Sequence, residues 1–175
     1  MSMTQIAFVK KATIPTKAQI QYTIQQLGYD FKILNGLDEQ IDQEGIMCSL
    51  NGKQVYFETF VDAARNVVSE NEAEWIESDL MNQETAISFV WGGDFVAGAC
   101  IGLVSVALIE LSNAFVYYMD DKMRYTKEML LGEMPQYMEE LSKQSKENLQ
   151  EIAMVSQANT HSEKTFWDKF KKIFN

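Results

Sequence analysis

The longest apolar stretch of the chain covers residues 86–119 and falls into three runs. The outer two are strand-sized and rich in Val, Phe and Tyr, whereas the middle one is helix-sized and rich in small residues, so the pattern predicts strand, helix, strand. Asp94 can cap the start of the helix, and Asn113 can adopt the left-handed conformation that ends it. A helix that is apolar on nearly every side must be buried on nearly every side, so we expect residues 94–112 to form the core helix.

The first part of the chain carries the signals of a strand, a helix and a second strand. Residues 5–9 and 31–34 are short runs of β-forming residues. Between them, Thr16 and Gln19 have the spacing of a capping box, and apolar residues recur at helical spacing as far as Gly28. A helix that ends at Gly28 is therefore predicted between two strands.

The clearest local signal is the Asn-Gly pair at residues 51–52, which lies between two runs of β-forming residues. Asn and Gly accept the positive φ angles that a two-residue turn requires, so this segment predicts a β-hairpin. The polar, acidic segment 37–45 before it is predicted to be a loop.

Two helices are predicted after the hairpin. Thr59 with Asp62, and Ser69 with Glu72, have the spacing of capping boxes. We therefore expect residues 60–80 to form two consecutive helices that are broken near Ser69.

The last part of the chain has helical spacing with interruptions. Residues 124–131 are predicted to be helical, Gly132 and Pro135 to interrupt the helix, and residues 134–155 to continue it. A polar linker is expected at residues 156–164.

Residues 165–175 are expected to form an amphipathic helix with aromatic and lysine faces. This helix either folds back on the domain or binds a partner or an anionic membrane surface.

Length and composition fit one globular domain. The chain has 175 residues, of which 46% are hydrophobic and 23% charged. Together with the element order, this predicts an α+β fold: a single domain over residues 1–155, with a mixed sheet of about six short strands packed around the core helix and flanked by the other helices.

The net charge of −10 is concentrated in one region. Residues 38–94 contain thirteen acidic residues against two basic ones, a sum of −11. An acidic surface repels phosphates, which argues against a nucleic-acid partner and favours a basic protein partner. The residues expected to bind that partner are the acidic side chains Glu70, Glu72, Glu74, Glu77 and Asp79.

The cysteines and the N-terminus point to a reducing cytoplasm. Cys48 and Cys100 each lie in an apolar run and are expected to be buried, reduced thiols. The first fifteen residues place their lysines after the apolar residues and carry no small-residue cleavage site, so a secretory signal is not predicted.

A membrane span is the alternative reading of the core helix. Residues 95–109 form its longest stretch without a charge. At about 1.5 Å per residue this stretch reaches about 22 Å, which is short of the roughly 30 Å of a hydrocarbon core. We therefore predict no membrane span.

No cofactor is predicted from the glycines around the start of the core helix. Gly93 and Gly98 have the spacing of a phosphate-binding loop, but Ala99 and Cys100 stand where Lys and Ser or Thr are needed. Asp94 also places a negative charge where a phosphate would lie.

A second alternative is a small carboxylate- or metal-dependent enzyme. The sequence at residues 118–121, Tyr-Met-Asp-Asp, is similar to the magnesium-binding hairpin of reverse transcriptases, which makes Asp120 and Asp121 the candidate metal ligands. The chain is too short for that polymerase fold and has no basic cleft for a template. The primary prediction therefore contains no catalytic residue and no metal site.

In size, acidity and lack of catalytic motifs, the sequence AISFVWGGDF at residues 86–95 and the acidic region before it resemble the small cytoplasmic immunity proteins of bacterial toxin systems, contact-dependent or type VI. The resemblance implies neutralisation of a cognate toxin by occlusion, and complementary charge would speed the encounter with a basic toxin. It transfers no residues. The predicted function is thus non-enzymatic protein binding; a self-associating adaptor or structural protein is a further alternative.

Overall fold

The computed structural model describes residues 2–80 and 82–173, with the side chains of all of these except Glu77 and residues 151–173. Two compact units are found, Met1–Tyr137 and Met138–Asn175. The elements are β1 (Met3–Val9), η1 (Lys11–Thr13), α1 (Lys17–Gln26), β2 (Phe31–Ile33), β3 (Ile46–Leu50), β4 (Lys53–Ala63), α2 (Ala64–Glu70), η2 (Glu74–Ile76), α3 (Glu77–Leu80), β5 (Thr85–Trp91), α4 (Phe95–Ser112), β6 (Phe115–Tyr118), β7 (Met123–Tyr125) and α5 (Lys127–Ile173).

The predicted α+β class is confirmed. Within the described residues, seven strands form a sheet in the order β2-β3-β4-β5-β1-β6-β7. Every neighbouring pair is antiparallel, so the expectation of a mixed sheet is wrong, whereas the seven strands agree with the expected number of about six. β5 and β6 do run parallel to each other across the α4 connection, but β1 lies between them and pairs with both.

The local turn and cap signals are confirmed. Thr16 and Gln19 form both hydrogen bonds of the capping box of α1. Asn51 and Gly52 join β3 to β4 with φ angles of 50° and 77°. The side chain of Asp94 accepts a hydrogen bond from the amide of Ala97 at 2.9 Å at the start of α4.

β4 is longer than predicted and belongs to two parts of the sheet. Residues 53–57 pair with β3, and residues 58–63 pair with β5. The buried Thr59 pairs with Phe89 and donates its hydroxyl to the carbonyl of Asp42 at 2.5 Å, so it is not a helix cap. The prediction of a helix from residue 60 is therefore wrong. Pairing with β5 holds this segment extended, which a local capping pattern cannot report.

Helix α2 begins at Ala64, and its cap residue makes no side-chain hydrogen bond. The expected break between two helices is present, but it lies after Glu70. Glu72, predicted to belong to a second capping box, has a φ of 50° in the intervening turn.

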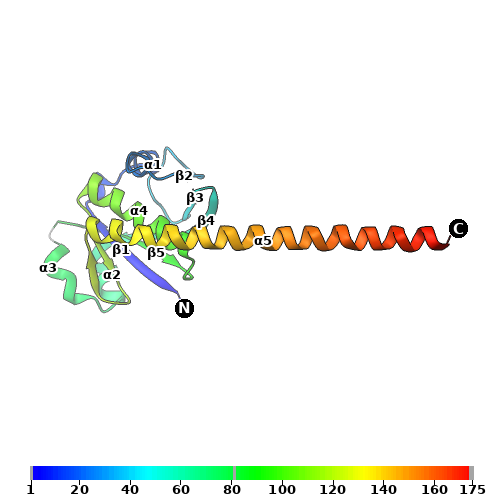
Figure 1. Ribbon diagram of the computed structural model, residues 1–175. Helices are drawn as coiled ribbons and strands as arrows, with labels where there is room; N and C mark the ends of the chain where they lie inside the picture. The colour runs from blue at the N-terminus through cyan, green and yellow to red at the C-terminus, as the bar shows by residue number, and fades with distance from the viewer. Residues whose placement is uncertain (1, 81, 174–175) are drawn as a thin grey trace. The chain divides into compact units, whose positions relative to one another are not determined.

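The sheet is covered on both faces by helices (Figure 1). On one face, Ile6, Phe8 and Tyr117 form a core cluster with Val67 of α2 and Ile76 of η2. On the other face lies α4, where Gln5 of β1 donates a hydrogen bond to Ser105 at 2.6 Å. Because side chains alternate along a strand, β1 thus contributes to two cores.

Helix α4 is the predicted core helix. Of its 18 residues, 78% are buried inside the structure, and Asn113 ends it in the left-handed conformation, with φ of 51° and ψ of 43°. Its length and mean hydropathy of 2.1 would also suit a membrane span. Because the sheet and α1 already cover it, burial within the domain accounts for its apolar sequence, as expected.

Helix α5 runs without a break from Lys127 to Ile173. The predicted interruption at Gly132 and Pro135 is wrong, and so is the predicted helix start at residue 124, because residues 123–125 pair with β6 as β7. The backbone of residues 156–164 is helical as well, so no break in regular structure lies where the linker was expected.

The domain boundaries at residues 155 and 164 stay a prediction. The side chains of residues 165–175, expected to form an amphipathic terminal helix, lie outside the described side chains.

Candidate functional site

Three of the five predicted partner-binding residues lie on the surface after α2. Glu70, Glu72 and Glu74 are exposed, and none of the described ion pairs involves them. Glu70 is the last residue of α2, where the helix dipole disfavours a negative charge. Local stability therefore does not explain why a glutamate stands there. The side chain of Glu77 lies outside the described residues.

Asp79, the fifth predicted residue, has partners within the molecule. Its carboxylate accepts a hydrogen bond from the Tyr117 hydroxyl at 2.5 Å and lies 3.5 Å from Arg124. Arg124 also lies 4.3 Å above the ring of Phe115, and Trp75 packs edge-on against Tyr117. Asp79 therefore ties α3 to the end of the sheet and is less accessible to a partner than the three exposed glutamates.

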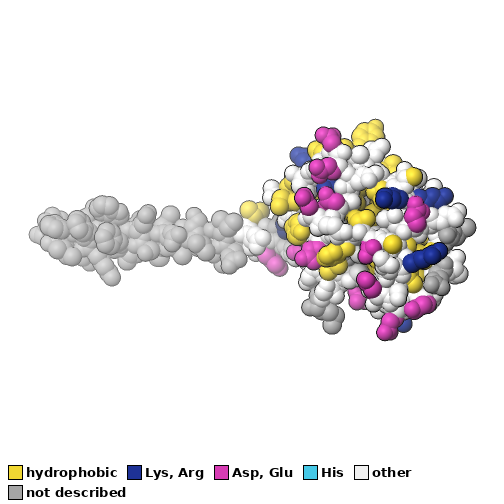
Figure 2. All heavy atoms as spheres, turned by 180° about the vertical axis from the view of Figure 1, so that it is seen from behind, with side chains coloured by type: hydrophobic (Ala, Val, Ile, Leu, Met, Phe, Trp, Pro, Cys, Tyr) yellow, Lys and Arg dark blue, Asp and Glu magenta, His cyan; other side chains and the backbone are white. Residues whose placement is uncertain are grey.

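The acidic side chains on the face seen in Figure 2 are spread among apolar side chains and do not merge into one continuous patch. Lys and Arg side chains lie on the same face, so a partner there would meet charges of both signs with apolar side chains between them.

In the part of the chain that the structure describes, Asp120 and Asp121, the alternative metal ligands, are not joined by further ligands. Asp120 and Asp121 follow β6 in the turn to β7, and Asp120 accepts a hydrogen bond from the amide of Thr4 at 3.3 Å. Among the described residues, no group of three or more His, Cys, Asp or Glu side chains is placed to hold a metal ion. In this structure, Asp120 fixes the position of the hairpin turn relative to β1.

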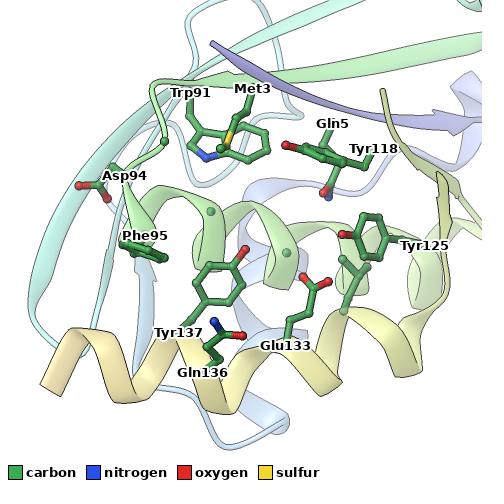
Figure 3. A pocket seen from close by; sticks show the side chains of 14 residues that line it. Met3, Gln5, Trp91, Asp94, Phe95, Tyr118, Tyr125, Glu133, Gln136 and Tyr137 are labelled. Atoms are coloured by element: carbon green, nitrogen blue, oxygen red, sulfur yellow. The ribbon is translucent and has the colours of Figure 1, made fainter. Parts of the chain in front are cut away.

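A cavity of about 350 Å³ lies between the N-terminal half of α4, strands β1, β5, β6 and β7, and the first turns of α5 (Figure 3). It belongs to the unit Met1–Tyr137. Its aromatic lining consists of Trp91, Phe95, Tyr118, Tyr125 and Tyr137, and its other lining residues are Met3, Gln5, Gly93, Asp94, Gly98, Gly102, Leu130, Glu133 and Gln136.

The aromatic side chains of the cavity form two groups. The ring centroids of Trp91, Tyr118 and Tyr125 follow one another at intervals of 6.3 Å. On the other side, Phe95 of α4 lies 6.3 Å from Tyr137 of α5. Figure 3 shows Glu133 and Tyr137 pointing from α5 towards Trp91 and Tyr118 across the open space.

The cavity exists partly because two residues of α4, Gly98 and Gly102, have no side chain. A Cβ atom at Gly98 would lie 3.4 Å from the ring of Tyr137, whereas a Cβ atom at Gly102 would meet no atom within 4 Å. Glycine inside a helix lowers stability by about 1 kcal/mol relative to alanine. Helix stability therefore does not explain the glycine at position 102.

Glu133 and Asp94 are the carboxylates that line the cavity, and Glu133 affects the tyrosines around it. Burial first, and then the charge and hydrogen bond of Glu133, raise the pKa of Tyr125. Burial and the charge of Glu133 also raise the pKa of Tyr137. Both hydroxyls therefore stay protonated at neutral pH, and that of Tyr125 donates its proton to Glu133.

The sequence analysis missed this cavity. Its lining residues come from β1, the end of β5 and the turn after it, the first turns of α4, and segments 118–125 and 130–137, which only the fold brings together. The spacing of Gly98 and Gly102, one turn apart on an otherwise apolar helix, is the signal that could have marked it.

No protein-family model, no curated protein and no solved structure matches this chain.

Proposed function

We propose that the chain is a non-enzymatic binding protein whose acidic surface recognises a basic protein, as an immunity protein does when it occludes its cognate toxin in the bacterial cytoplasm. The observation that carries the proposal is the sum of −11 over residues 38–94, together with the exposure of Glu70, Glu72 and Glu74 without ion-pair partners among the described residues.

Two properties of these three glutamates support a role in recognition. Glu70 stands at the unfavourable end of a helix, and Glu72 occupies a left-handed position where Gly or Asn is more usual. Neither residue is explained by local stability. Their joint field would accelerate the encounter with a basic surface, since opposite charges raise association rates more than they raise final affinity.

The first test is genetic. The proposal predicts that the neighbouring gene encodes a large secreted protein with a toxic C-terminal domain, and that co-expression of this chain restores growth of cells that express that domain. Failure of the chain to bind or neutralise the domain would contradict the immunity assignment.

The second test locates the binding surface on the chain. The triple variant Glu70→Lys, Glu72→Lys, Glu74→Lys should associate with the toxin domain about tenfold or more slowly at low salt, and its rate should depend less on NaCl concentration. Association rates can be measured by stopped-flow fluorescence at several salt concentrations.

A matched control separates this surface from total charge. Asp30, Asp121 and Glu147 are exposed, and their reversal to lysine changes the net charge by the same amount. This control variant should associate much faster than the first. Equal slowing by both variants would show that net charge alone steers the encounter, and would remove the surface after α2 from the mechanism.

A further inference from the structure

The charges in the cavity beside α4 all have one sign. Glu133 and Asp94 are acidic, and the lining contains no Lys, Arg or His. The remaining polar side-chain groups are the tyrosine hydroxyls, the indole N–H of Trp91 and the amides of Gln5 and Gln136. An anion entering this space would meet negative charge without a cationic partner, whereas a cation would be stabilised by Glu133.

The aromatic rings add a second attraction for cations. The faces of Trp and Tyr rings carry partial negative charge and attract a cation within about 6 Å of the ring centroid. Trp91, Tyr118 and Tyr137 border the same space from two sides, so a group placed between them is within reach of more than one ring. Burial among rings also suits the apolar parts of an organic cation better than a small hydrated metal ion.

From this arrangement we infer that the cavity is a binding site for a small organic cation of the quaternary ammonium class, held between the aromatic rings and paired with Glu133. The volume of about 350 Å³ falls in the range of small-molecule sites, which is about 300–1,000 Å³. Gly102 supplies the open floor against which the apolar part of the ligand lies.

This site is separate from the acidic surface proposed to bind a protein. Glu70, Glu72 and Glu74 do not line the cavity. The two proposals can therefore fail independently of each other.

Choline and its neutral isostere 3,3-dimethylbutan-1-ol test whether the cavity selects positive charge. Titration of the full chain, followed by Trp fluorescence and by calorimetry, should give a Kd of about 1 mM or below for choline and at least tenfold weaker binding of the alcohol. Equal binding of both compounds would overturn the cation assignment, and absence of choline binding at about 50 mM would overturn the site.

Nα-acetyl-lysine methylamide separates a free cation from the lysine side chain of a protein. Choline should bind more tightly than this capped lysine, because a quaternary ammonium loses less hydration on entering an aromatic site. Binding of the capped lysine without binding of choline would show that the cavity receives a protein side chain and would overturn the proposal.

The role of Glu133 is tested by Glu133→Gln, which keeps the shape of the side chain and removes its charge. This variant should weaken choline binding about tenfold and change binding of the neutral alcohol little. Unchanged choline affinity in the folded variant would exclude Glu133 as the counter-ion.

Two glycines provide a matched steric test. Gly102→Met would place a side chain in the cavity, and Gly132→Met would place the same side chain on α5 outside the cavity lining; a Cβ atom meets no neighbour within 4 Å at either position. Both changes favour helix formation, so both variants should fold. Gly102→Met should abolish choline binding while Gly132→Met retains it, and retained binding in Gly102→Met would place the ligand elsewhere.

Discussion

At the scale of single residues, Tyr117 of β6 contacts side chains from several neighbouring elements. It is buried in the sheet, donates a hydrogen bond to Asp79 of α3, and contacts the rings of Phe8 and Trp75. One hydroxyl thus links β6 to the short helix α3. A hydrogen bond to a charged group contributes about 1.5–3 kcal/mol when it is buried. This one is part-buried, and the Asp79 side chain is 43% exposed, so a smaller contribution is expected.

Replacing Tyr117 by Phe should lower the free energy of unfolding by about 0.5–1.5 kcal/mol, because Asp79 loses its hydroxyl donor while the ring is kept and water can reach the carboxylate. Urea denaturation at pH 7 measures the change. Tyr22→Phe, at a side chain that is 63% exposed, is the control and should change stability little.

The stabilities of wild type and Tyr117→Phe should respond differently to alkaline pH. Burial, and then the hydrogen bond to Asp79, raise the pKa of Tyr117. Above about pH 10 the unfolded chain therefore releases this proton before the folded chain does, and the stability due to Tyr117 falls as pH rises. The difference between wild type and Tyr117→Phe should be constant from pH 7 to about 9 and then shrink; a constant difference up to pH 11 would contradict this account.

The two cysteines should be inert in the folded protein. Cys48 and Cys100 are fully buried, and the hydrogen bond to Cys48, followed by burial, raises the pKa of the Cys100 thiol. Because the thiolate is the reactive form, labelling by a disulfide reagent should proceed no faster than unfolding, with both thiols reacting in denaturant. Ser78→Cys, at an exposed position, should add one thiol that reacts at once. Rapid labelling of the wild-type chain would contradict the described burial.

At the scale of elements, the sequence predicted those features that depend on adjacent residues. The Asn51-Gly52 turn and the Asp94 cap need only their own neighbours, and both are present. The extended conformation of Thr59 depends instead on Phe89, thirty residues away, and no local pattern contains that information. For the same reason the helical spacing that begins at Arg124 was misleading, because pairing with Tyr117 holds this segment in β7.

Helix α5 allows a direct test at this scale, since it continues through Pro135. Proline lacks an amide hydrogen and crowds the preceding turn, so Pro135→Ala should stabilise the protein by up to about 3 kcal/mol and raise its helical content. Circular dichroism and thermal unfolding measure both effects. Pro15→Ala, which lies before the cap of α1, should give no such gain. Equal stability of Pro135→Ala and wild type would indicate that the helix is broken near residue 135.

At the scale of the whole molecule, topology decides what the sequence could not show. The order of predicted elements left open whether β5 and β6 would pair directly, and the insertion of β1 between them makes the entire sheet antiparallel. The same insertion brings Gln5 and Met3 to the cavity beside α4. Surface charge, in contrast, follows from composition, which is why the acidic region could be recognised before the fold and the aromatic cavity could not.

The long strand β4 gives the domain a property that none of its parts would have alone. Its first half is bonded to β3 and its second half to β5, so a single run of backbone spans both regions of the sheet. Separating the β3–β4 hairpin from the rest of the sheet would also strain the hydrogen bonds between β4 and β5. The hairpin and the centre are therefore expected to come apart together, in one cooperative transition and without a stable half-opened form.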